Sequence, residues 1–184
     1  MKVACTKAQA ATRQLDEAII LLFADHDPLA IRTLASAAHG IFADIADIKS
    51  PNGSWRERII LDSVLSRKEA ISILNSAQNY LKHANFDPDK ELSFDEEEND
   101  HVIFVSTLEC IEFGYPLSFQ MQVFQIWYLA SYPEKIGINS DPVQKSIVAF
   151  PANFNQLIRE ERLKHGAMFT DTMSTRYQRA HTAE

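Results

Sequence analysis

Apolar and polar residues recur with a helical period along most of the chain. Between residues 28 and 48, one side of a helix would carry five apolar side chains, namely Leu34, Ala38, Ile41, Ile45 and Ile48. The opposite side would carry small and basic residues, namely Arg32, Ala35, Ser36, His39 and Ala43. Because small side chains let a second helix approach closely, this pattern predicts a central helix that is buried on both sides.

Two further segments have strong apolar stripes. In residues 67–84 the stripe consists of Ala70, Ile73, Leu74, Ala77, Leu81 and Ala84. In residues 118–132 the stripe consists of Phe119, Val123, Ile126 and Ala130, and it is widened by Met121, Phe124, Trp127 and Tyr128. Such wide apolar cover fits a core helix. It also fits a helix shared between two subunits, and we therefore expect a homodimer.

Capping residues mark where the helices begin and end. Asp27-Pro28 and Asp141-Pro142 are typical helix starts, and "SWRE" and "SRKE" both fit the capping box. Gly114 and Gly166 stand where a helix would end in a left-handed residue. These signals predict helices over residues 6–24, 28–48, 54–65, 67–84, 96–113, 118–132, 142–150 and 153–165.

The predicted fold is all-α, a single-domain irregular bundle of about seven or eight helices. The helical domain would span residues 1–166, and residues 167–184 would form a polar C-terminal tail. A strand is the alternative in "HVIFVSTLECIEF", which is rich in β-branched residues. We favour a helix because Val102, Val105, Leu108 and Glu112 recur at helical spacing.

Composition and charge narrow the function classes. The chain has 184 residues, two cysteines and no apolar run longer than "AIILLFA", so we expect a cytoplasmic protein without a membrane span. The net charge of −7 comes from residues 87–100, which hold eight acidic residues against Lys90. The rest of the chain is neutral, and this balance disfavours nucleic acid as a partner.

The most distinctive polar surface lies opposite the stripe of residues 67–84. Asn75, Asn79 and His83 follow each other four residues apart, with Lys82 beside them and Asp87 shortly after. A solvated surface is one interpretation, although Glu and Lys are more typical of such surfaces. The other is a hydrogen-bonding site whose amide, lysine and imidazole groups would bind an anionic small molecule or a phosphate.

The same stretch carries a resemblance. "NYLKHANFDP" resembles the N-F-x-K-H-A-D-x-D-P stretch of a group of small bacterial proteins of unassigned function. "QLDEAIILLFADHDPLAIRTLASAAHGI" is similar to the opening helical pair of that group. The resemblance implies an all-helical fold over about the first 115 residues and directs attention to Asn79, Lys82, His83 and Asp87. Asn85 departs from the pattern, because the group has an aspartate there.

A second resemblance suggests an enzyme. A small helical domain in which an arginine is followed a few residues later by a histidine resembles the HEPN domains. This resemblance implies metal-independent RNA cleavage. Arg32 would steady a phosphate and His39 would move the 2′-hydroxyl proton. The pairs Arg159–His165 and Arg176–His181 also fit by spacing, and Thr33 departs from the polar residue that often follows the arginine.

Other chemistry receives little support. Glu98 and His101 have the spacing of a di-iron ligand pair, but no second such pair exists, so we expect no metal. No nucleotide-binding glycine loop is present, and we expect no cofactor. Cys110 lies among apolar residues and is expected to pack as a small hydrophobic group. Two functions stay open: a binding module for an anionic ligand or protein partner, and an RNase using Arg32 and His39.

Overall fold

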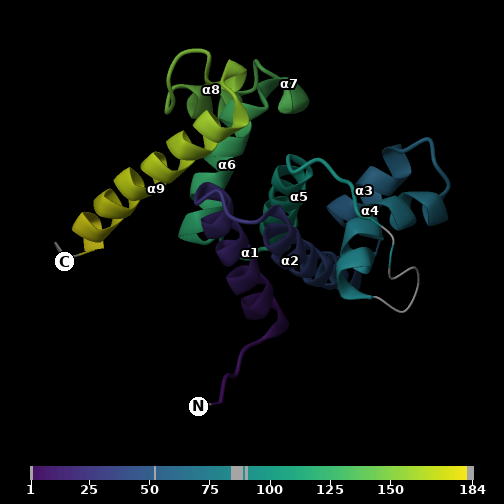
Figure 1. Cartoon of the computed structure of the whole chain (residues 1–184). Helices are drawn as coiled ribbons and strands as arrows, with labels where there is room; N and C mark the ends of the chain where they lie inside the picture. The colour runs from purple at the N-terminus through teal and green to yellow at the C-terminus, as the bar shows by residue number, and fades with distance from the viewer. Residues whose placement is uncertain (1, 52, 84–88, 90, 182–184) are drawn as a thin grey trace. The chain divides into compact units, whose positions relative to one another are not determined.

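The fold is all-α, as predicted (Figure 1). The computed structural model describes residues 2–51, 53–83, 89 and 91–181. Within these ranges it contains nine α-helices and one 3-10 helix, more than the seven or eight predicted: α1 Lys7–Phe23, α2 Pro28–Lys49, α3 Trp55–Asp62, α4 Arg67–Lys82, α5 Glu98–Glu112, α6 Phe119–Ser131, α7 Pro133–Ile136, α8 Asp141–Ile147, η1 Phe154–Gln156 and α9 Arg159–His181. The additional elements are α7 and η1, and both are short: α7 has four residues and η1 has three.

The chain packs as two compact units. Unit 1 consists of Met1–Ala18 and Asp27–Pro116, and unit 2 consists of Ile19–His26 and Leu117–Glu184. Helix α1 therefore contributes its first part to unit 1 and its last part to unit 2.

Most predicted helix starts are confirmed. The side chain of Asp27 accepts hydrogen bonds from the first N–H groups of α2, and Ser66 and Glu69 form a complete capping box on α4. At α3 only half of the box forms, since Ser54 caps the helix while Glu57 pairs with an arginine instead. The start at Asp141 is wrong by one residue, because Ser140 occupies the N-cap position of α8.

Helix α2 buries its small side more completely than its apolar stripe, of which only Ala38 is fully buried. Ala35, Ala43 and Ala46 are fully buried, and α2 lies along α5, which those small side chains allow to come close. In contrast, Ile48 from the predicted stripe is 83 % exposed. The close approach of a neighbouring helix was predicted correctly, but the assignment of the larger stripe to the core was wrong at Ile48.

Helix α6 organises an aromatic core in unit 2. Trp127 is fully buried, its ring lies edge-on to Phe23 at 5.5 Å between centroids, and its Nε1 donates a hydrogen bond to the carbonyl of Arg162 at 2.7 Å. Met121, Phe124 and Tyr128 are buried in the same unit. One chain therefore covers most of the apolar surface of α6, so that surface no longer argues for a second subunit, and the homodimer stays a prediction.

The predicted helix end at residue 165 is wrong. Helix α9 continues through Gly166 to His181, so most of the predicted polar tail is helical. Gly114 does end a helix, with φ +76° and its N–H donating to the carbonyl of Ile111. Gly166 has a different role: a Cβ added there would lie 3.0 Å from Trp127 Cδ1 and closer still to the ring of Phe23.

This contact gives a prediction about two helical glycines. Gly166→Ala is expected to lower the free energy of unfolding by about 1–3 kcal/mol, because the new methyl group overpacks the aromatic core. Gly40→Ala in α2 is the control, since nothing lies within 4 Å of its added Cβ. It is expected to raise stability by up to about 1 kcal/mol. Urea unfolding of both variants gives the sign of each change, and equal signs would contradict the packing role of Gly166.

One helix of the described residues is long and apolar enough to cross a membrane. This helix is α2, and it passes that test by length and composition alone. The run "AIILLFA", which is the longest uninterrupted apolar run, lies outside α2 and is too short. The core helix of a soluble protein passes it as well, and α2 buries its small side against α5.

Candidate functional site

The polar side of α4 is accessible in unit 1. Asn79, Lys82 and His83 are exposed, Asn75 is half-buried, and Ala70 and Ala77 are buried on the other side of the helix. His83 is the C-cap residue, and its backbone N–H donates to the carbonyl of Asn79 at 3.1 Å. The structure thus places Asn75, Asn79 and Lys82 on α4, and His83 directly after its last residue, where the backbone is extended.

Two further predictions about this region concern the core position of Ile73 and the ligand-binding role of Asp87. Ile73, assigned to the core stripe, is 60 % exposed, so that assignment is wrong; among the described side chains of α4, Ala70 and Ala77 are the buried ones. Asp87 lies outside the described residues, as does Ala84.

Arg32 lies inside unit 1. Its side chain is almost fully buried, with Nη1 3.3 Å from Glu98 Oε2 and the guanidinium 5.5 Å from the centre of the Phe94 ring. The charge that the RNase hypothesis assigned to a phosphate is therefore already paired with a carboxylate of α5.

His39 is also held within the protein. Burial lowers the pKa of His39 to about 4, with further lowering by the positive charges of Arg56 and Arg32 and a partial offset by Asp44. The ring is therefore neutral near pH 7, and its Nδ1 is buried without a hydrogen-bond partner among the described residues. Arg32 and His39 act on each other electrostatically; Arg32 is buried and the residue His39 is half-buried.

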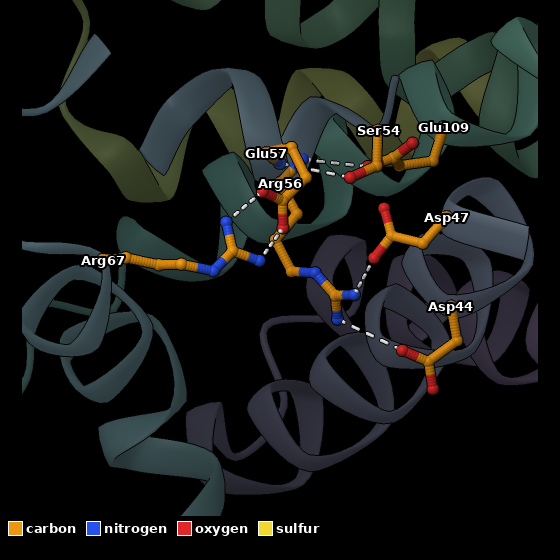
Figure 2. A network of polar contacts seen from close by, with 7 residues as sticks. All are labelled: Asp44, Asp47, Ser54, Arg56, Glu57, Arg67 and Glu109. Carbon is orange, nitrogen blue, oxygen red and sulfur yellow. Dashed lines mark hydrogen bonds and ion pairs between the residues drawn. The ribbon is translucent and has the colours of Figure 1, made fainter. Parts of the chain in front are cut away.

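An arginine–carboxylate network surrounds this region (Figure 2). Arg56 on α3 forms ion pairs with Asp44 and Asp47 on α2, the first at 3.2 Å. Glu57 forms a two-pronged pair with Arg67 on α4, with Arg67 Nη2 2.6 Å from Glu57 Oε1. The network ties α2, α3 and α4 together, and it leaves these arginines engaged with internal partners.

Glu109 joins the network to α5. Its carboxylate is 1 % exposed and accepts the backbone N–H of Arg56 at 3.0 Å, so a side chain from α5 caps the start of α3 (Figure 2). Burial raises the pKa of Glu109, and the backbone N–H groups of Arg56 and Trp55 lower it in part. Sequence reasoning missed this role. The signal was a charged residue flanked by Leu108 and Cys110 in an apolar stretch.

The remaining chemical candidates are less suited to catalysis. Burial, with a contribution from the charge of Asp16, raises the pKa of Cys110 to about 11, so the thiol stays protonated near pH 7. Glu98 serves as the partner of Arg32. No group of three histidine, cysteine or acidic residues in the described ranges is arranged to hold a metal ion.

The other two arginine–histidine pairs lie on α9 in unit 2. His165 meets the ring of Phe154 edge-on at 5.9 Å between centroids, and Arg176 is exposed three turns later. The side chain of His181 lies outside the described residues. His165 and Arg176, which belong to different predicted pairs, line the same groove.

Neither protein-family models, nor curated proteins, nor solved structures give a match to this chain.

Proposed function

We propose that the protein is a binding module without catalytic activity, and that the polar side of α4 recognises an anionic group on its ligand or partner. The observation that carries this proposal is the exposure of Asn79 and Lys82 on α4 and of His83 at its C-cap, while Ala70 and Ala77 on the other side of the helix are buried. The helix fixes the backbone at Asn79 and Lys82, so binding has to order their side chains but not their backbone.

The chemistry of these side chains favours an anion. The ammonium group of Lys82, the amide of Asn79 and the imidazole of His83 all donate hydrogen bonds. Lys82 forms no ion pair within the described residues, whereas Arg32, Arg56 and Arg67 are each paired with carboxylates. An incoming anion at Lys82 therefore displaces no ion-pair partner among the described residues.

The geometry gives less support to an RNase that uses Arg32 and His39. Both side chains lie among residues of α2, α3 and α5, where Arg32 already has Glu98 as its partner. A neutral His39 with a pKa of about 4 is also a weak proton acceptor near pH 7.

A titration with inorganic phosphate tests the proposed site. We expect the amide signals of Asn79, Lys82 and His83 to shift in two-dimensional ¹H–¹⁵N NMR spectra. Lys82→Ala is expected to weaken phosphate binding about five-fold, since an exposed charge pair contributes about 1 kcal/mol. Lys68→Ala is the matched control, because Lys68 is exposed at the other end of the same helix.

Two outcomes would overturn the proposal. One is an equal loss of phosphate affinity in the Lys82→Ala and Lys68→Ala variants, which would indicate nonspecific attraction. The other is cleavage of mixed RNA by the purified protein that disappears in a His39→Ala variant, which would establish the nuclease instead.

A further inference from the structure

Unit 2 contains a groove that is separate from the α4 site and from the Arg32–His39 pair. Its volume is about 420 Å³, within the range of small-molecule sites. It lies between the segment that follows α8 and one side of α9, and its main lining residues are Phe150, Pro151, His165, Met168, Phe169 and Arg176.

Packed aromatic rings form the apolar part of the groove. Phe150 stacks on the buried ring of Phe154 at 4.3 Å between centroids, with 14° between the ring planes, and it lies 5.1 Å from the ring of Phe169. Because Phe154 is held in the core, Phe150 has a fixed support. This surface is suited to a flat apolar group, which rings of this kind bind by offset stacking or edge contacts.

The charged side chain that lines the groove, Arg176, is positive. Arg176 contributes a guanidinium group and His165 an imidazole, and the described lining residues include no carboxylate. Arg176 makes no ion pair within the described part of the chain. The hydroxyl of Thr172 already donates to the carbonyl of Met168 at 2.9 Å, so it can only accept a further hydrogen bond. The lining thus offers donors to an anion beside an apolar surface.

We propose that this groove binds a small aromatic carboxylate, with the ring against Phe150 and Phe169 and the carboxylate at Arg176. An arginine fork matches the two oxygens of a carboxylate, and the rings supply the apolar contact area. The proposal is independent of the α4 site, since it concerns another unit and another set of residues.

Binding of 2-naphthoate tests the proposal. We expect this probe to shift the NMR amide signals of Phe150, His165 and Arg176, with a dissociation constant on the order of 0.1–1 mM for a ligand of this size. Arg176→Ala is expected to weaken binding about ten-fold while the fold is retained, because Arg176 is exposed. Lys164→Ala, a loss of charge on the same helix outside this groove, is the matched control.

A neutral analogue separates the carboxylate from the ring. We expect 2-naphthalenemethanol to bind the unaltered protein at least five-fold more weakly than 2-naphthoate, and to bind the Arg176→Ala variant with unchanged affinity. Three outcomes would overturn the proposal: no shift of the groove signals at 5 mM naphthoate, equal effects of Arg176→Ala and Lys164→Ala, or equal affinity for the alcohol and the carboxylate. None of these outcomes affects the phosphate titration at α4, so the two proposals fail separately.

Discussion

Trp127→Ala is expected to lower the free energy of unfolding by about 3–5 kcal/mol. The indole is fully buried, and its loss would leave a cavity beside Phe23 and Phe124, whose ring centroids lie 5.5 and 5.6 Å away. The carbonyl of Arg162 would also lose the N–H donor that approaches it at 2.7 Å. Urea unfolding followed by circular dichroism measures the loss.

Two conservative variants separate packing from hydrogen bonding. Trp127→Phe keeps a ring but removes the N–H donor, so we expect it to cost less than the alanine variant. Trp55→Phe is the matched control, because Trp55 is only half-buried and its ring lies against Arg58 with 4.7 Å between the guanidinium carbon and the ring centre. A loss below about 1 kcal/mol in Trp127→Ala would contradict the central position of this side chain in unit 2.

Acidification is expected to destabilise the protein through His39. Burial and the charges of Arg56 and Arg32 lower the pKa of His39 in the folded state from 6.5 to about 4. Between these values the unfolded chain binds a proton that the folded chain does not, so stability falls as the pH falls. The contribution of His39 is fully present above pH 6.5, and about 2–3 kcal/mol of it is lost by pH 4.5.

The measurement compares urea unfolding at pH 7.5 and pH 4.5. Carboxylates titrate in the same range; among them, pairing with Arg67 lowers the pKa of Glu57. The difference between the unaltered protein and His39→Gln therefore isolates the histidine. His83→Gln is the matched control, because it makes the same substitution at an exposed histidine. A His39→Gln variant with the same pH dependence as the unaltered protein would show that His39 is not held in its neutral form.

Local signals in the sequence predicted most of the helices. Asp27, Ser66 and Gly114 act on backbone groups within a few residues, so their roles can be recognised without knowledge of the fold. The exposed polar side of α4 could be predicted for the same reason, since residues four apart always share one side of a helix.

Long-range contacts account for what the sequence did not reveal. Glu109 caps α3 from a position 53 residues away, and no local pattern encodes such a pairing. The side of α2 that is buried depends on how closely α5 approaches, so the small residues are inside while Ile48 is outside. A glycine is typical of helix ends, so the sequence predicted an end at Gly166. The structure instead shows that a side chain at this position would collide with the ring of Phe23.

The path of α1 has a consequence for any attempt to divide the molecule. The boundary after Pro116 suggests that a single cut would yield two independent fragments. A fragment beginning at Leu117 would lack Ile19–His26, and with it the phenylalanine ring that packs beside Gly166 and Trp127. The larger fragment would in turn carry Ile19, Leu22 and Phe23 away from the core in which they are buried. Unit 2 thus includes eight residues from near the start of the chain, so we expect that a cut after Pro116 leaves the core of unit 2 incomplete.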